Sequence, residues 1–189
     1  LAETADQDRD ISSRAIVALS AMAVVFIGGV YYVLTGNPLI TVTTTLIMVL
    51  MAFFFTAVAS YIVGLVGNSN SPVSGMTITA VLFTGGLLLL FGFTGMEGMV
   101  ATLGVAAIVC CAACTSGDVC NDLKTGSLVG ASPFRQQTMQ VLGVAAASLV
   151  MAPILQLLHD NTPGGIGGRE LSAPQATLFK GLVEGLFGQ

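Results

Sequence analysis

The sequence predicts an all-α membrane protein with about five transmembrane helices and a short C-terminal helix that is interfacial or re-entrant. Hydrophobic residues make up 54% of the 189 residues and charged residues only 8%, whereas a soluble domain carries about 25% charged residues. The mean hydropathy is +0.88. Between Arg14 and Glu97 there is no Asp, Glu, Lys or Arg, and the apolar runs there exceed the roughly 20 residues that cross a hydrocarbon core.

Five apolar runs define the expected spans, at residues 15–35, 39–66, 74–92, 98–116 and 136–158. The run at 39–66 is longer than a bilayer requires, which indicates a tilt or a break, and Gly64 and Gly67 lie where a break would fall. The sixth segment, 173–187, is too short to span the bilayer. It carries Lys180 and Glu184 four residues apart on one helical face, so we expect an interfacial, re-entrant or lid helix.

Basic residues near the span ends predict the orientation, because they are retained on the cytoplasmic side of a membrane. Arg9 and Arg14 precede the first span. With five spans, the connection at 117–135, which holds two more basic residues, falls on the same side as the N-terminus. Four of the six basic residues therefore predict a cytoplasmic N-terminus.

The start of the chain, LAETADQDRD, is acidic and lacks Met. A signal peptide would have a basic start and a shorter apolar core, so we expect the chain to begin inside a larger gene product, as a single transmembrane segment of a larger protein. The net charge of −4 and the absence of a basic stripe exclude nucleic-acid binding from the expected functions.

A cluster of amide and hydroxyl side chains, GNSNSPVSGMT, occupies residues 67–77. Ser71 followed by Pro72 predicts the N-cap and first residue of the third helix. A helix start that faces a membrane cavity offers unpaired N–H donors and a positive dipole end, which hold substrate carboxylates in secondary transporters. The alternative is an ordinary turn at the membrane surface. The candidate substrate-binding residues are Asn68, Ser69, Asn70, Ser71, Ser74 and Gly75.

A second polar stretch, SGDVCNDLKTG, occupies residues 116–126. Asp118 and Asp122 lie on one face if the helix continues, and two carboxylates there repel more strongly when desolvated. A shared proton, a bound cation, or Lys124 and Arg135 as counter-charges would relieve the repulsion. Ionisable groups in or beside spans mark proton and ion pathways, so we expect Asp118, Asp122 and Lys124 to take part in proton coupling. The alternative is a solvated cytoplasmic loop.

Four cysteines, Cys110, Cys111, Cys114 and Cys120, lie along one apolar segment. Four thiols on one helix do not easily converge on an ion, and Cys packs like a small hydrophobe, so we expect neither a metal site nor a cofactor. His159 stands without a second His or Cys nearby, which favours a surface role. No phosphate-binding loop, dinucleotide fingerprint or nucleophile elbow is present, so we do not expect an enzyme.

Three segments occur in order between apolar runs: GNSNSPVSGMTI, SGDVCNDLKTGSLVGASPFRQQ and RELSAPQATLFKGLVEGLF. Together they resemble the oligopeptide transporter (OPT) superfamily, in particular its prokaryotic members and their yellow stripe-like relatives. The likeness runs from about Arg9 to the C-terminus. The family's Gly-Asp and Asp-Leu-Lys-Thr-Gly motifs correspond to residues 117–118 and 122–126, and Cys120 departs from the pattern. Full members have many more than five spans, so the chain resembles a segment from the later half of a transporter.

The resemblance implies proton-coupled secondary transport of small peptides or peptide-like metal chelates across a bacterial cytoplasmic membrane. The expected partners are lipid, substrate, protons, and the remaining spans of the parent transporter or a second copy. We expect the stretches at 67–76 and 116–126 to interrupt the helices, approach each other and line part of the route. Two alternatives stay open: a non-transporting membrane scaffold or assembly subunit, and a metal or redox membrane protein that uses the cysteines.

Overall fold

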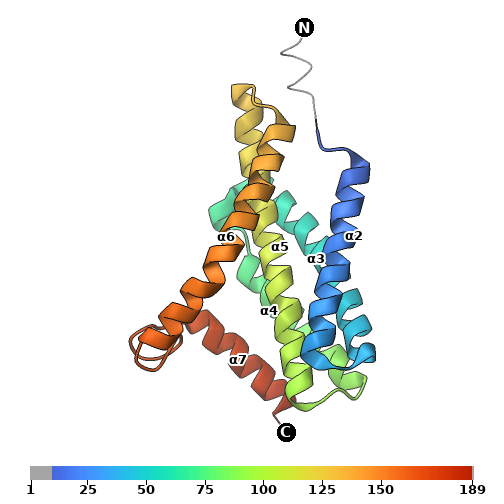
Figure 1. Cartoon of the computed structure of the whole chain (residues 1–189), viewed down its shortest axis with the longest axis vertical. Helices are drawn as coiled ribbons and strands as arrows, with labels where there is room; N and C mark the ends of the chain where they lie inside the picture. Colours follow the sequence, from blue (N-terminus) through green and yellow to red (C-terminus); the bar gives the residue numbers. More distant parts are fainter. Residues whose placement is uncertain (1–9, 189) are drawn as a thin grey trace.

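The computed structural model describes residues 10–188, and this part of the chain consists of helices joined by connections of which the longest, 162–173, contains an isolated β-bridge between Ile166 and Leu171. Figure 1 shows the long helices running roughly along the longest axis of the molecule, with α7 crossing obliquely at the base. In chain order the elements are α2 (Ser13–Thr35), α3 (Pro38–Val66), the 3-10 turn η1 (Asn68–Asn70), α4 (Val73–Leu90), α5 (Gly95–Val129), α6 (Pro133–Asn161) and α7 (Pro174–Phe187).

Helix α5 is the centre of the bundle, since α2, α3, α4 and α7 all contact it. Small residues on its buried face, such as Ala101 and Ala106, allow close approach of the neighbouring helices. Tyr31 of α2 is 2% exposed and lies against Gly104 of α5, where a methyl group would be 2.7 Å from the Tyr31 ring. The core is therefore made of close helix contacts around α5.

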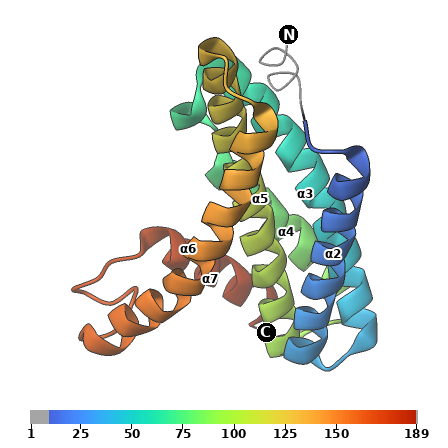
Figure 2. The ribbon, with the colours of Figure 1, turned by 45° about the horizontal axis from the view of Figure 1, so that its top comes forward.

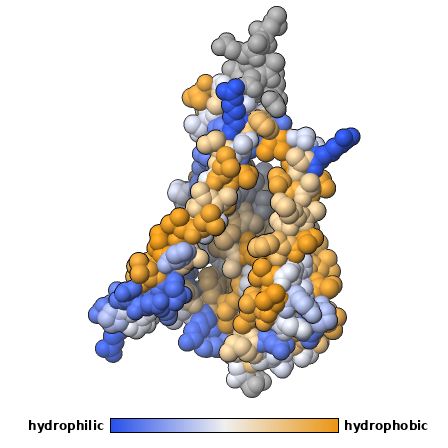
Figure 3. Space-filling model, in the orientation of Figure 1, coloured by the Kyte–Doolittle hydropathy of each residue, from blue (hydrophilic) through white to orange (hydrophobic). Residues whose placement is uncertain are grey.

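Within residues 10–188, five helices are long and apolar enough to cross a membrane: α2, α3, α4, α5 and α6. This confirms the predicted fold class, and the expected spans agree with the observed helices to within a few residues at most ends. Apolar side chains cover much of the surface in Figure 3, along α6 and over α2. Side chains such as Phe26, Phe53 and Leu149 are at least 70% exposed, as expected for surfaces that meet lipid or other spans.

One predicted boundary is wrong: the connection expected at 117–135 is helical up to Val129. Helix α5 has 35 residues, or about 52 Å at 1.5 Å per residue, which exceeds the roughly 30 Å hydrocarbon core. The polar residues after Gly117 mark a change in the surroundings of the helix, and they contain no proline to end it. The helix ends at Gly130, whose φ of 76° is left-handed.

The start of the third span also differs from the prediction. Ser71 was expected as the N-cap with Pro72 as the first helical residue, but Pro72 occupies the N-cap position and α4 begins at Val73. The backbone N–H of Val73 donates to the carbonyl of Ser71 instead of to its hydroxyl. The break considered near Gly64 is absent, because α3 continues through it and ends at Gly67 (φ 80°).

Helix α6 leaves the bundle, and the chain returns through α7 (Figures 1 and 2). None of the residues of α6 is buried, and its contacts are mainly with α5. Helix α7 has 14 residues, or about 21 Å, which is too short to cross a bilayer. It packs on α4 and α5 through Val183 and Phe187, and its exposed face carries the expected pair of Lys180 and Glu184, 3.7 Å apart.

Candidate functional site

The two polar stretches meet where α3 ends against the second half of α5. Gly67 ends α3 with a positive φ of 80°, a backbone conformation that favours glycine. The chain then forms η1, closed by a hydrogen bond of 3.2 Å from the Ser71 N–H to the Asn68 carbonyl. This turn contacts both α3 and α5, so the sequence after Gly67 directs the first stretch toward the second.

A side-chain hydrogen bond joins the stretches: Asn68 Nδ2 donates to Asp118 Oδ1. The two residues are 50 positions apart in the sequence. A bond from an amide donor to a charged carboxylate is stronger than one between neutral groups. The expectation that the two stretches approach each other is confirmed, although only the first interrupts the helices, because the second is part of α5.

The remaining residues of the first stretch do not all face this contact. Asn70 Nδ2 donates to the Val66 carbonyl at 3.2 Å, and so binds the exposed end of α3. The Ser71 hydroxyl oxygen is buried without a hydrogen-bond partner among the described residues. Ser69, Ser74 and Gly75 are exposed. Asn70 therefore has a local structural contact, whereas Asn68 reaches the second stretch.

Asp122 lies one turn beyond Asp118 and contacts α6. Its carboxylate Oδ2 accepts a hydrogen bond of 3.0 Å from Gln140, and its backbone carbonyl accepts one of 3.0 Å from Gln136. The Gln136 carboxamide lies against Gly126, where any side chain would overlap it. Asp122 thus connects α5 to the first part of α6, and Lys124, two residues further along α5, is exposed.

A cavity of about 390 Å³ lies next to this second contact, between α5, α6 and the chain before α2. Gln140 lines it, together with the second-stretch residue Val119. A further cavity of about 370 Å³ lies between α4, α5 and α7 and is lined by Thr77, Cys110 and Lys180 among largely apolar neighbours. The first of these two cavities adjoins the second polar stretch through Val119, whereas the other touches the last residue of the first stretch, Thr77.

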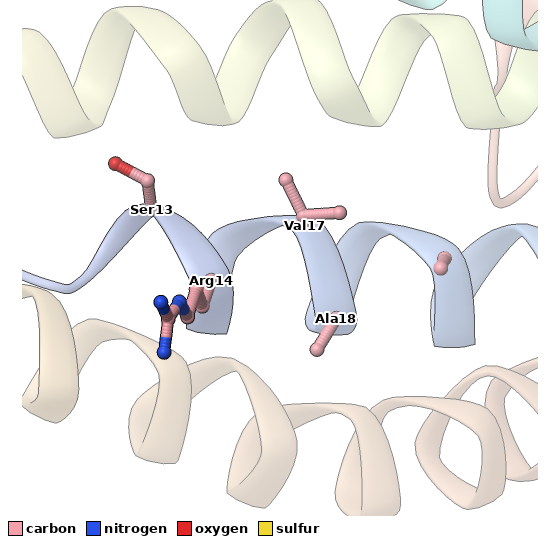
Figure 4. Close-up of a pocket in the computed structure, with 5 residues that line it drawn as sticks. Ser13, Arg14, Val17 and Ala18 are labelled. Atoms are coloured by element: carbon pink, nitrogen blue, oxygen red, sulfur yellow. The ribbon is translucent and has the colours of Figure 1, made fainter.

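A depression of about 420 Å³ follows the first turns of α2. Figure 4 shows Ser13 and Val17 pointing to one side of the helix, and Arg14 and Ala18 to the other. Every residue that lines it belongs to α2. This depression is separate from the contacts of Asp118 and Asp122, and it contains none of the candidate substrate-binding residues.

The four cysteines lie along α5 with free thiols, and Cys111 and Cys114 are exposed. Between residues 10 and 188, no three His, Cys, Asp or Glu side chains come together as a metal site would require. His159 is exposed at the end of α6, where its Nδ1 accepts a hydrogen bond of 3.2 Å from the Ile166 N–H. Its role is thus to hold the connection between α6 and α7.

The structure adds three residues that the sequence interpretation did not select: Gly117, Gln136 and Gln140. Gln136 and Gln140 contact Asp122, 14 and 18 positions away, and Gly117 lies against Asn68; nothing local in the sequence marks the two glutamines. Gly117 was indicated only as part of the Gly-Asp pair at 117–118, which corresponds to a motif of the family. The site is a pair of contacts, Asn68 with Asp118 and Asp122 with α6.

Five long apolar helices and polar contacts between distant segments define a polytopic α-helical membrane protein. Residues 2–189 match the family described as OPT oligopeptide transporter protein, and the chain belongs to this family.

Two relatives illustrate the range of the family. A protein of Haemophilus influenzae, "Putative oligopeptide transporter", is 33% identical over 205 residues, which cover 95% of this chain and 32% of the relative. The rice protein "Probable metal-nicotianamine transporter YSL13", from Oryza sativa subsp. japonica, is 29% identical over 139 residues, covering 69% of this chain and 19% of the relative. Both are named as transporters and neither as an enzyme. The comparison with solved structures gave no match.

The chain spans about a third of the length of the bacterial relative and about a fifth of the rice relative.

Proposed function

We propose that this chain is part of a secondary transporter that imports small peptides, or metal chelates with peptide-like carboxylates, together with protons. The observation that carries the proposal is the contact of Asn68 with Asp118, which brings an amide-rich turn to a carboxylate. Ionisable groups in or beside membrane spans commonly take part in proton or ion pathways, and the Asp118 side chain is exposed beside this turn.

Asp118 stands where the apolar part of α5 ends. From Gly95 to Gly117 the helix carries a single charged residue, Glu97, whereas Asp118, Asp122 and Lys124 follow within two turns. A carboxylate at such a boundary can exchange protons with water on one side and still contact groups within the helix bundle. We assign the binding of the transported proton to Asp118. The charges of Asp122 and Lys124 adjust how strongly Asp118 binds that proton.

The substrate is proposed to bind beside this carboxylate, at the turn and the start of α4. Ser69, Ser74 and Gly75 are exposed there, and the first N–H groups of α4 are close to them in sequence. Free N–H groups at a helix start favour a carboxylate ligand, which peptides and peptide-like chelates both have. Asn68 and Asn70 are assigned to shaping the turn, because their amide donors already bind Asp118 and Val66.

The exposed apolar surface of α6 supports the view that this chain works within a larger helical assembly. The helix has 29 residues, none of them buried, and it lines the cavity beside Asp122 through residues that include Gln137 and Gln140. A polar group left facing lipid costs several kcal/mol, by the general estimate for unsatisfied groups. We propose that further spans of the same transporter, or a second copy, cover α6 and complete the route, with the N-terminus in the cytoplasm of a bacterial cell.

The test is uptake into proteoliposomes that contain the full-length protein, with a small peptide library and a set of metal chelates, and with the outside made more acidic. The proposal expects accumulation of at least one class that depends on the proton gradient. The matched control is the same protein without a gradient, in which the substrate should only equilibrate.

Two results would contradict the proposal. Accumulation that is the same with and without the gradient would remove proton coupling, while leaving a transporter. A membrane scaffold would be favoured if neither substrate class is taken up and if the thiol of a Ser69→Cys variant is labelled equally fast with and without substrates.

A further inference from the structure

Gly117 occupies a position in α5 where the helix passes directly beneath the turn that carries Asn68. Gly117 is buried, and it directly precedes Asp118. A methyl group at this position would lie 2.6 Å from Asn68 Oδ1 and 3.0 Å from Val63 Cγ2. A separation below about 3 Å is a steric overlap, so the Asn68 carboxamide has to move from its place over α5 if residue 117 has a side chain.

The two ends of the Asn68 carboxamide are therefore held by consecutive residues of α5. The oxygen lies over the bare Cα of Gly117, and the nitrogen donates to the carboxylate of Asp118. The backbone supports this arrangement from the other side, because Gly67 ends α3 and the N–H of Ser71 closes the turn on the Asn68 carbonyl. Asn68 has little freedom to rotate away while these contacts remain.

We propose that Gly117 is a positioning residue for transport: by lacking a side chain, it lets Asn68 hold the carboxylate of Asp118 in its working orientation. This inference rests on the function proposed for Asp118. It assigns to Gly117 and Asn68 a shared role that neither performs alone, since both act through one hydrogen bond. In this proposal Asn68 orients the Asp118 carboxylate and does not bind the substrate.

The experiment is a double-mutant cycle of Gly117→Ala and Asn68→Ala in the full-length protein, with uptake as the first measurement. Each single change removes the same hydrogen bond, so each should lower the uptake rate by about tenfold, the order expected for one bond to a charged group. The double variant should be no slower than either single variant, because the bond can be lost only once. Gly86→Ala is the control, since it lies within α4 and has no atom within 4 Å of the added methyl.

A second measurement does not depend on transport: hydrogen exchange at the Ser71 amide, which closes the turn. Gly117→Ala and Asn68→Ala should both speed this exchange several-fold, and Gly86→Ala should leave it unchanged. The Val63→Ala/Gly117→Ala variant distinguishes the effect of the contact with Val63 from the effect of the contact with Asn68. It relieves the contact with Val63 and keeps the overlap with Asn68, so the faster exchange should persist.

Unchanged exchange at Ser71 in Gly117→Ala would overturn the inference. So would normal exchange in Val63→Ala/Gly117→Ala, or uptake losses that multiply to about a hundredfold in the double variant. If exchange responds as expected while the unaltered protein takes up no substrate, the positioning of Asn68 stands and the proposed function fails. The two failures are therefore distinguishable.

Discussion

Replacing Gly98 with Ala tests whether α7 is held on the bundle by its last aromatic residue. Phe187 is 4% exposed and lies over Gly98 of α5 and Gly85 of α4. A methyl group at Gly98 would be 2.5 Å and 2.9 Å from two atoms of the Phe187 ring, and 3.2 Å from the Phe93 carbonyl oxygen. The ring and the carbonyl confine the methyl group from both sides, so we expect Phe187 to leave its place.

The expected change in the free energy of unfolding follows from two opposing effects of the added methyl group. Overpacking costs about 1–3 kcal/mol, whereas replacing Gly by Ala within a helix stabilises by about 1 kcal/mol. Gly86→Ala has the second effect alone, because no neighbour lies within 4 Å of its methyl group. The free energy of unfolding of Gly98→Ala should therefore be about 1–3 kcal/mol lower than that of Gly86→Ala, or about 2–12 °C in Tm for a chain of this size.

The assay is thermal unfolding of both variants in detergent, with limited trypsin digestion as a local probe. Lys180 lies in α7 and is a trypsin site that should be protected while the helix is docked and folded. Gly98→Ala should expose it to faster cleavage, and Gly86→Ala should not. Equal Tm values and equal cleavage rates for the two variants would refute the packing of Phe187 over Gly98.

Two further changes probe the contacts of α6. Gln140→Leu removes the 3.0 Å bond to the Asp122 carboxylate and should lower the Tm relative to Gln137→Leu by the equivalent of about 1 kcal/mol; equal Tm values would show that the bond contributes nothing. His159→Phe removes the acceptor of the Ile166 N–H, so hydrogen exchange at the Ile166 amide should be about five times faster, which corresponds to about 1 kcal/mol. An unchanged exchange rate would contradict this contact.

The sequence predicted the number of long helices because each span is a long apolar run, and lipid leaves the backbone few alternatives to a helix. Helix ends were predicted well where glycine or proline breaks the chain, as at Gly36–Asn37–Pro38, where Asn37 is the N-cap of α3. The end of α5 was missed because polarity was taken as the end of the helix. Hydropathy reports where a helix leaves lipid, whereas Gly130 determines where it stops.

The sequence predicted the polar groups of the candidate site but not the hydrogen bonds between them. The amide and carboxylate groups were visible in the sequence, and their approach was expected. Which donor meets which acceptor depends on how α3 packs against α5, so the bond from Asn68 to Asp118 required the structure. The roles of Gln136 and Gln140 were not predicted, because a glutamine in a helix gives no local sign of the group that it will contact on another helix, here the backbone carbonyl and the carboxylate of Asp122.

The most direct test of the proposed function is the accumulation ratio of a transported substrate under a gradient of one pH unit, measured for the unaltered protein and for Asp118→Asn. One proton moved with each substrate supports up to about a tenfold ratio per pH unit, since one unit is worth about 1.4 kcal/mol. Asp118→Asn cannot carry the proton, so the ratio should fall to about one while exchange of substrate continues. An Asp118→Asn protein that accumulates substrate as well as the unaltered protein would contradict the assignment of Asp118.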